Sequence, residues 1–208
     1  MLAAKYEAPS NIALVKYWGK YGKQLPRNAS VSFTLNMCKS IFEVRLSDKA
    51  SKDIEVQIEF EGKDNPKFAE KISKFFKTIV SDYPIVEQYR FNIVSANTFP
   101  HSSGIASSAS SMAALAMCLE ELQYETPDIQ RASNAARLGS GSASRSVIPK
   151  LGWWGAHAAQ PLSSNEYAIP VWEDVDEIFH TYQNAILIAS SGEKSVSSSL
   201  GHELMNNH

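Results

Sequence analysis

The 208-residue sequence has only two cysteines, and their placement excludes several classes of protein. Cys38 and Cys118 lie far apart and fit no redox or metal-binding motif, and the five histidines show no ligand spacing. A disulfide-rich secreted domain and a zinc site are therefore not expected. The simplest interpretation is two buried, reduced thiols in a cytosolic protein.

Net charge and long apolar runs are equally scarce. The formal charge is -2, the isoelectric point is near 6.2, and no apolar run approaches transmembrane length. The N-terminus carries no signal-peptide pattern. These features argue against nucleic acid or an anionic membrane as a partner and predict a cytoplasmic protein. With 44% hydrophobic residues, the chain suits one large domain, or one domain plus part of another.

The sequence Pro100-His-Ser-Ser-Gly-Ile-Ala-Ser-Ser-Ala-Ser-Ser111 is a loop of small residues that leads into an apolar helical pattern. A helix N-terminus favours a phosphate, because its amide groups are unpaired and the dipole is positive there. A hydroxyl of Ser107 or Ser108 could also help to hold Mg²⁺ on that phosphate. The predicted phosphate-binding residues are Gly104, Ala106, Ser107, Ser108 and Ser110. The alternative is a simple helix cap, and the loop is not a Walker motif because no Gly-Lys-Ser/Thr follows.

A cationic, aromatic stretch follows the apolar run at residues 12–15, which we interpret as a buried strand. This stretch contains Lys16, Tyr17, Trp18, Lys20, Lys23 and Arg27. In a nearly neutral protein such a local cluster indicates a small polyanionic ligand. The alternative is a solvated loop, although a solvated loop has no need of two adjacent aromatic side chains.

The rest of the chain gives alternating strand patterns and three helical patterns. Alternation predicts strands at residues 31–35, 42–46, 56–60 and 91–94, forming an antiparallel sheet with one wet face. Helical spacing predicts helices over residues 68–79, from the small-residue loop to about Gln123, and after Thr126, which looks like an N-cap before Pro127. Residues 149–182 look irregular, with Trp153 and Trp154 in the core or an interface, and residues 185–189 look like a short strand.

A second small-residue loop, Ser140-Gly-Ser-Ala-Ser-Arg-Ser146, begins where Gly139 ends the third predicted helix. Arg145 offers a planar fork that can bind a carboxylate or a phosphate, although a surface salt bridge is an equally good interpretation. Taken together, the loops and cations describe a site for several phosphate groups. ATP with a phosphorylated small molecule fits, and the chemistry would be phosphoryl transfer.

Several segments resemble the diphosphomevalonate decarboxylases of the GHMP kinase superfamily. They are Ala8-Pro-Ser-Asn-Ile-Ala-Leu-Val-Lys-Tyr-Trp-Gly-Lys20, Pro26-Arg-Asn-Ala-Ser-Val-Ser-Phe-Thr-Leu35, Gly104-Ile-Ala-Ser-Ser-Ala-Ser110, Ala136-Arg-Leu-Gly-Ser-Gly-Ser-Ala-Ser-Arg145 and Val196-Ser-Ser-Ser-Leu-Gly201. They occur in the family's order and cover nearly the whole chain. Lys-Tyr-Trp-Gly-Lys separates the decarboxylases from the kinases, which share only the phosphate loop.

The resemblance implies a reaction and a role for each matching residue. ATP would phosphorylate the tertiary hydroxyl of 5-diphosphomevalonate, and that phosphate would leave as carbon dioxide is lost, giving isopentenyl diphosphate. Lys16 would neutralise the transferred phosphoryl group, Arg145 would bind the carboxylate, and the Ser107–Ser108 pair would contact ATP and magnesium. The implied substrate-binding residues are Tyr17, Lys20, Ser140, Gly141, Ser142, Arg145 and Ser198, with Ser197 or Ser199 in place of Ser198 under a one-residue slip.

One family feature is missing from the sequence. The family's catalytic base lies in an Asp-x-Gly-Pro-Asn motif, which these 208 residues do not contain. We therefore expect a GHMP-kinase-like N-terminal domain over residues 1–182, the beginning of an incomplete ferredoxin-like C-terminal domain over residues 183–208, and weak or absent turnover by this chain alone. The alternatives are a GHMP-type kinase that phosphorylates a mevalonate derivative, and a domain that binds without turnover.

The predicted fold is an α+β domain with a mixed or antiparallel sheet and helices on one side. The resemblance also implies the superfamily's left-handed βαβ unit and a homodimer.

Overall fold

The computed structural model describes residues 2–100, 105 and 107–187 of the chain. Its main sheet has seven strands in the order β6-β5-β7-β4-β8-β9, with β1 paired to β4 outside this path. These strands are β1 (Ala3–Val15), β4 (Ser30–Ser47), β5 (Val56–Phe60), β6 (Lys63–Asp64), β7 (Arg90–Asn97), β8 (Leu151–Trp154) and β9 (Ala168–Pro170). A separate hairpin pairs β2 (Lys20–Tyr21) with β3 (Leu25–Pro26).

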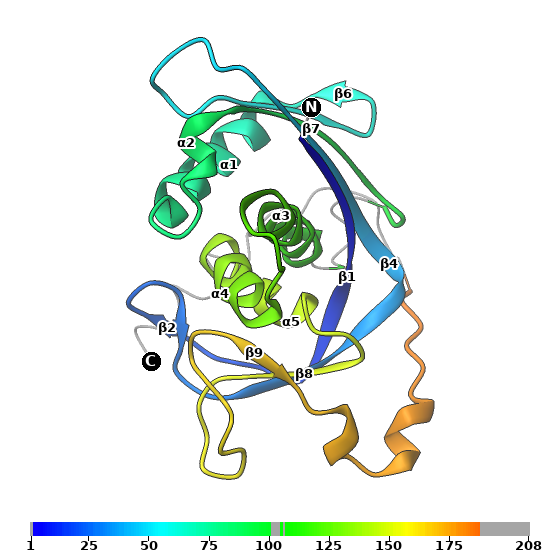
Figure 1. Cartoon of the computed structure of the whole chain (residues 1–208). Helices are drawn as coiled ribbons and strands as arrows, with labels where there is room; N and C mark the ends of the chain where they lie inside the picture. Colours follow the sequence, from blue (N-terminus) through cyan, green and yellow to red (C-terminus); the bar gives the residue numbers. More distant parts are fainter. Residues whose placement is uncertain (1, 101–104, 106, 188–208) are drawn as a thin grey trace.

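The helices lie within the curve of this sheet, as Figure 1 shows. They are α1 (Pro66–Ile79), α2 (Ile85–Gln88), α3 (Ser107–Gln123), α4 (Ile129–Gly139) and α5 (Ala143–Ser146), followed by the 3₁₀ turns η1 (Trp172–Asp174) and η2 (Glu177–Thr181). The α3 helix packs on β1 and β4 and also contacts α4 and α5. The α+β class, the mixed sheet and the single helical side are therefore confirmed.

The α1 and α3 helices form for different physical reasons. In α1 the Asn65 side chain accepts a hydrogen bond from the Phe68 amide at 3.1 Å, and Pro66 occupies the first turn. One face of α1 is buried, through Ile72, Phe75, Phe76 and Ile79. The α3 helix is buried on nearly all sides from Ala109 to Ala116, as expected for a central helix. Both helices match the predicted periods.

The predicted strands at residues 31–35 and 42–46 are one continuous strand, β4. The polar residues between them look like a turn, but Asn36 and Met37 lie exposed on an unbroken strand. The sheet is also not wholly antiparallel, because β5 pairs in parallel with β7. In the first part of β4 the serines are buried and Val31 and Phe33 are only half-buried, so the inward face there is the polar one. Alternation does not reveal which face points inward.

Other sequence expectations are corrected at single residues. Asp128, not Thr126, is the N-cap of α4, because its side chain accepts from the Arg131 amide at 2.8 Å. Residues 12–15 do lie on a strand, but Leu14 and Val15 are exposed.

Further corrections concern the second half of the chain and one thiol. Residues 149–182 include β8 and β9 and are not irregular throughout, and Trp154 is in the core as predicted. Residues 185–187 form no strand, and 188–189 lie outside the described residues. Cys118 is buried but Cys38 is only partly so.

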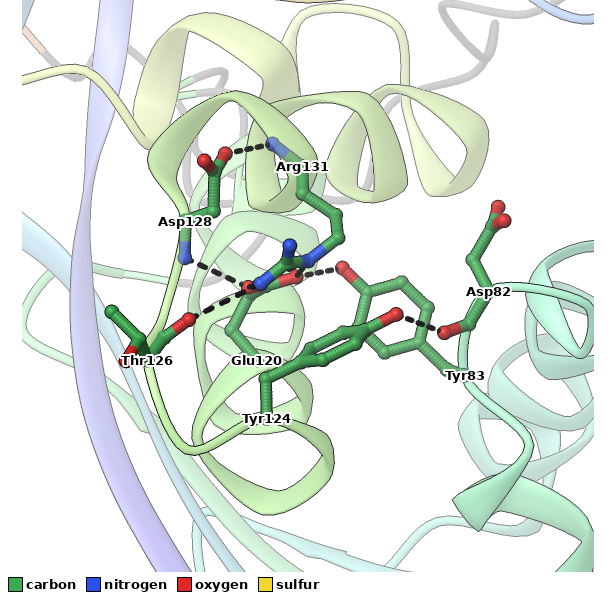
Figure 2. A network of polar contacts seen from close by, with 7 residues as sticks. All are labelled: Asp82, Tyr83, Glu120, Tyr124, Thr126, Asp128 and Arg131. Carbon is green, nitrogen blue, oxygen red and sulfur yellow. Dashed lines mark hydrogen bonds and ion pairs between the residues drawn. The ribbon is translucent and has the colours of Figure 1, made fainter.

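A polar network ties the end of α3 to the start of α4 and to the loop before α2 (Figure 2). The Glu120 carboxylate is fully buried and accepts hydrogen bonds from the Tyr83 hydroxyl, the Asp128 amide and the Arg131 guanidinium, the last at 2.7 to 3.1 Å. The guanidinium of Arg131 also lies 3.7 Å from the centre of the Tyr124 ring. Burial, followed by the hydrogen bond to Glu120, raises the pKa of Tyr83 above its usual value. The two buried or half-buried charges of this network, Glu120 and Arg131, pair with each other at 2.7 Å.

No helix in the part of the chain that the structure describes has both the length and the apolar character needed to cross a membrane.

Candidate active site

The loop after β1 is shaped by one asparagine. The Asn28 side chain accepts from the Trp18 amide at 2.7 Å and donates to the Lys16 carbonyl at 3.0 Å. Gly19 has φ +74, a conformation that glycine adopts without strain. As a result the Lys16 and Trp18 side chains are exposed, whereas Tyr17 turns inward.

Tyr17 forms a small aromatic core with β8. Its ring meets Trp154 edge to face, with the ring centres 4.8 Å apart, and Ile148 and Ala168 belong to the same cluster. The Arg145 guanidinium lies 5.5 Å from the centre of the Tyr17 ring and 5.8 Å from that of Trp154. Two residues predicted from distant parts of the sequence therefore lie side by side.

Arg145 is a buried charge. It is only 2% exposed. Its Nε donates to Ser32 Oγ at 2.8 Å, its Nη1 donates to Ser30 Oγ, and its Nη2 makes a weaker contact with Asn11 at 3.4 Å. Among the described residues it forms no ion pair. The idea of a surface salt bridge is therefore wrong.

Burial lowers the pKa of Arg145 to about 10, so the side chain remains charged at neutral pH. A buried charge that meets only neutral oxygens is costly. An anionic ligand would offset that cost.

The loop after α4 brings the predicted substrate-binding residues together. The Ser140 amide ends α4 by donating to the Ala136 carbonyl at 2.9 Å. Asn11 Nδ2 then donates to the Ser142 carbonyl at 3.1 Å and to Ser146 Oγ at 2.7 Å, which ties this loop to β1. Lys20 is half-buried on the other side of the loop, and burial lowers the pKa of its ammonium group.

Gly141 is required by close packing. A Cβ atom at this position would lie 3.1 Å from the Tyr17 hydroxyl, 3.1 Å from Trp154 Cη2 and 3.3 Å from Lys20 Cε. The structure thus brings five predicted residues together: Tyr17, Lys20, Gly141, Ser142 and Arg145. Lys16 is exposed and precedes Tyr17 in the sequence, Ser140 precedes Gly141, and Ser198 falls outside the described residues.

The start of α3 borders a separate pocket of about 340 Å³. Ser107 and Ser108 line it together with Lys67 and Lys71 of α1, and Phe60 and Phe68 add apolar surface. The pocket therefore combines the N-terminal ends of two helices with two lysines, a combination that favours an anion.

Other predicted phosphate-binding residues are less accessible or not described. Ser110 is fully buried and shares a hydrogen bond of 2.7 Å with Ser40, so it faces the sheet and not this pocket. Its contact with ATP stays a prediction. Gly104 and Ala106 lie outside the described residues. Within the described part of the chain, no three His, Cys, Asp or Glu side chains gather as a metal site.

Comparison with known proteins shows the family of the chain. The profile described as "Diphosphomevalonate decarboxylase-like N-terminal domain" matches residues 8–165. The chain belongs to this family.

Named members of the decarboxylase family are similar along much of the chain. A diphosphomevalonate decarboxylase from Candida albicans is 37% identical over 165 residues, which are 74% of this chain and 45% of that protein. The solved mevalonate diphosphate decarboxylase from Staphylococcus aureus has a TM-score of 0.68 and 34% identity, covering 81% of this chain and 49% of that one. A structure described as MDDEF in complex with MVAPP, AMPPCP and magnesium has a TM-score of 0.72 and 30% identity, covering 97% and 59%. The chain thus spans about half the length of these relatives.

Sequence reasoning missed the residues that hold Arg145 in place. Asn11 lies within the segment at residues 8–20 that resembles the family. Its contact with Arg145 is visible only in the structure. Ser30 and Ser32 alternate with apolar residues, so they look like the solvent face of a strand. Lys67 and Lys71 look like the exposed face of an amphipathic helix, and the sequence has no signal that they lie beside the start of α3.

Proposed function

We propose that this chain forms the nucleotide- and substrate-binding part of an enzyme that converts 5-diphosphomevalonate to isopentenyl diphosphate with ATP. The observation that carries the proposal is Arg145, a buried cation without a carboxylate partner among the described residues. Tyr17, Lys20 and Gly141 lie beside it, and together these residues would bind a small molecule with several negative charges. Membership of the decarboxylase family supports the choice of molecule.

The substrate's two acidic ends match two parts of the cluster. Arg145 uses three of its five N–H donors on neutral oxygens, so it keeps donors for the substrate carboxylate. Lys20 and Tyr17, with Ser140, Gly141 and Ser142, would hold the diphosphate. Lys16, exposed on the same loop, would neutralise charge at the transferred phosphoryl group. Ser198 remains a predicted substrate contact.

The pocket at the start of α3 would take the nucleotide. Ser107 and Ser108 would contact the ATP phosphates, and one of them would hold Mg²⁺ together with phosphate oxygens. Lys67 and Lys71 would add positive charge, and the two phenylalanines would cover an apolar part of the nucleotide. Similar solved proteins support this ligand set, including MDDEF with MVAPP, AMPPCP and magnesium, and an Enterococcus faecalis enzyme described for mevalonate diphosphate mediated ATP binding.

The chemistry would proceed by phosphoryl transfer and fragmentation. The tertiary hydroxyl of the substrate gives its proton to a general base and attacks the γ-phosphorus of ATP, releasing ADP. The C–O bond to the new phosphate then breaks as the carboxylate C–C bond cleaves, and the electron pair from that bond forms the alkene. Carbon dioxide, phosphate and isopentenyl diphosphate are the products. The chain contributes cations that hold three anionic groups near one another, and magnesium neutralises the phosphates when bound.

Calorimetric titration of this chain with 5-diphosphomevalonate, using mevalonate as the comparator, tests the proposal. We expect binding of the diphosphate and much weaker binding of mevalonate, because the proposed cation cluster has no diphosphate to hold in mevalonate. Equal binding of both compounds, or of neither, would count against the assignment of the cluster.

Turnover is a separate matter, because the sequence has no Asp-x-Gly-Pro-Asn motif. We expect little or no release of carbon dioxide by this chain alone with ATP and magnesium. Rapid release would show that the catalytic base lies within these residues. We also propose, from the resemblance, a cytoplasmic homodimer, which sedimentation of the purified chain and imaging of a tagged copy would check.

A further inference from the structure

The start of α3 is tied to the strands on which it packs by two buried serines that have no role in the assignments above. Ser10 of β1 and Ser40 of β4 are both 0% exposed. Ser107, Ser108 and Ser111 of α3 line the pocket proposed for the nucleotide. Because backbone amide groups hold a phosphate at a helix N-terminus, the affinity depends on where the helix begins.

The Ser40 hydroxyl is the centre of a hydrogen-bond network between α3 and the sheet. It lies 2.7 Å from Asn97 Oδ1 on β7, 2.7 Å from Ser110 Oγ and 3.3 Å from Ser111 Oγ. The Asn97 oxygen can only accept, so Ser40 donates its one proton there and accepts from both α3 serines. The single donor and the two lone pairs of Ser40 are thereby all used.

These contacts restrict how α3 sits on the sheet. Ser110 and Ser111 are adjacent residues, and they are 0% and 4% exposed. Two hydrogen bonds from neighbouring positions to one acceptor fix the rotation of the helix about its axis as well as its distance from β4. Ser111 also lines the nucleotide pocket, so a change at Ser40 reaches the wall of that pocket directly. A displacement of about 1 Å is enough to weaken binding.

Ser10 holds the chain just before α3. Its hydroxyl donates to the Ile105 carbonyl, and the Ile105 side chain packs with Leu35 and Phe99 in a small apolar cluster. The register of β1 against β4 shifts between Pro9 and Ser10. This irregularity accounts for the burial of both Ser10 and the next residue, because neighbouring strand residues otherwise point to opposite faces. Ser10 therefore fixes the entry to α3 at a second point.

Ser95 is an equally buried serine without such a contact. It lies on β7, two residues before Asn97, and it is 1% exposed. Among the described residues, its hydroxyl has no hydrogen-bond partner. Burial of a serine in this sheet is therefore not sufficient for a contact with α3, and Ser95 provides a matched control for Ser40.

We infer that Ser10 and Ser40 are positioning residues for the nucleotide, because they hold the start of α3 where its amide groups and the Ser107–Ser108 pair meet the phosphates. The inference rests on the function proposed above, in which this pocket takes ATP. Each serine acts through the main chain or the side chains of the segment at residues 105–111, without touching the nucleotide itself.

Calorimetry with ADP and with 5-diphosphomevalonate on the full chain tests the inference. The variants are Ser10→Ala and Ser40→Ala, with Ser95→Ala as the control, and circular dichroism checks that each variant folds. We expect Ser10→Ala and Ser40→Ala to weaken ADP binding by about fivefold to tenfold each. Affinity for 5-diphosphomevalonate should change by no more than about twofold, which separates positioning of α3 from a general loss of structure. Ser95→Ala should bind both ligands as the unmodified chain does.

A double variant tests the route through the helix. Ser40→Ala combined with Ser110→Ala should bind ADP within about twofold of Ser40→Ala alone, because the two hydroxyls act as one pair. A further tenfold loss in the double variant would mean that Ser110 acts on the nucleotide independently of Ser40, and this would overturn the role given to Ser40.

The outcomes separate this inference from the function on which it rests. Unchanged ADP affinity in Ser10→Ala and Ser40→Ala overturns the inference, as does an equal loss in Ser95→Ala or an equal loss of 5-diphosphomevalonate affinity. If 5-diphosphomevalonate binds and ADP affinity does not depend on these serines, the inference fails and the proposed function stands. If ADP binding depends on them but 5-diphosphomevalonate does not bind, the inference stands and the proposed function fails. Absence of ADP binding to the unmodified chain overturns both.

Discussion

Arg131 and Arg145 are both held by hydrogen bonds to buried side chains, but the charges of their partners differ. Arg131 makes its closest contacts with the Glu120 carboxylate, whereas Arg145 reaches only two serines and an asparagine. Arg131 is also the more exposed of the two. The deeper arginine thus has the weaker set of partners. A buried charge without a carboxylate partner among the described residues is a candidate for binding an anionic ligand, whereas Glu120 and Arg131 already neutralise each other within the fold.

Removing the Glu120 carboxylate, which pairs with Arg131, should have the largest effect on stability. Glu120→Ala leaves Arg131, the Asp128 amide and the Tyr83 hydroxyl without their acceptor. We expect the free energy of unfolding, measured with urea, to fall by about 3 kcal/mol or more. The matched control is Glu121→Ala at the exposed neighbouring position, which should cost less than about 1 kcal/mol. Equal losses in the two variants would contradict the importance of the network.

Removing the positive charge of Arg145 should instead affect the binding of 5-diphosphomevalonate. Arg145→Met keeps an apolar side chain against Tyr17 and Trp154 but deletes the cation. We expect affinity for 5-diphosphomevalonate to fall by about 100-fold, measured by calorimetry, because a charge-assisted contact to the carboxylate is lost. The free energy of unfolding should stay within about 1 kcal/mol or rise, since an uncompensated charge leaves the interior.

Arg45→Met, on the exposed part of β4, serves as the control for both measurements. It should leave the affinity unchanged. A large loss of stability in Arg145→Met with unchanged affinity would mean that Arg145 resembles Arg131 after all.

A smaller change in the Arg145 cluster, at Gly141, should test how closely its side chains pack. Gly141→Ala places a methyl group about 3 Å from Tyr17, Trp154 and Lys20. We expect about a tenfold loss of affinity for 5-diphosphomevalonate, because Lys20 and Tyr17 must move apart. Gly62→Ala is the control: its added Cβ meets nothing, although its positive φ costs some stability, so its affinity should not change. Tight binding by Gly141→Ala would contradict the close approach of these three side chains.

The smallest expected effect concerns how the free energy of unfolding depends on pH, which reports on the cluster around Glu120. The pKa of Tyr83 is raised in the folded protein, whereas the unfolded chain loses this proton near pH 10. The folded state therefore binds more protons above pH 10, and stability falls as the pH rises through that range. We expect Tyr83→Phe to remove about 0.7 kcal/mol per pH unit from this slope at pH 10, rising toward about 1.4 kcal/mol per pH unit at pH 11 and above.

Urea unfolding between pH 9 and 11 measures this difference. Burial also raises the pKa of Cys118, to about 12, so part of the alkaline loss should remain in Tyr83→Phe. Identical slopes for the two proteins would show that Tyr83 ionises normally in the fold.

The sequence predicts individual helices and strands, but it contains little information about which of them pair or pack together. The spacing of Ile72, Phe75, Phe76 and Ile79 is sufficient for α1, because a helix is defined by its own period. The continuity of β4 could not be predicted, because its exposed middle looks like a turn. The parallel pairing of β5 with β7 joins strands that are separated in the sequence by α1 and α2, and no local sequence pattern indicates such a pairing.

The candidate site shows the same limit. Tyr17, Lys20, Gly141, Ser142 and Arg145 were predicted because they stand in recognisable short segments. Ser30 and Ser32 were missed because period-two alternation gives two faces and does not say which is inside. A pocket beside the β2–β3 hairpin brings Lys20 and Lys23 of the predicted cationic stretch together with Lys77 of α1, and no sequence pattern indicates that α1 ends there.

The length of β4 has a consequence for how the molecule opens. Its residues 30–33 bond to β8, next to the Arg145 cluster, and its residues 40–47 bond to β7, in the main core. One backbone is therefore shared by both halves of the sheet. In amide hydrogen exchange, the protons of β8 should be released in the same opening event as those of β7, and a ligand that slows exchange in one half should slow it in the other.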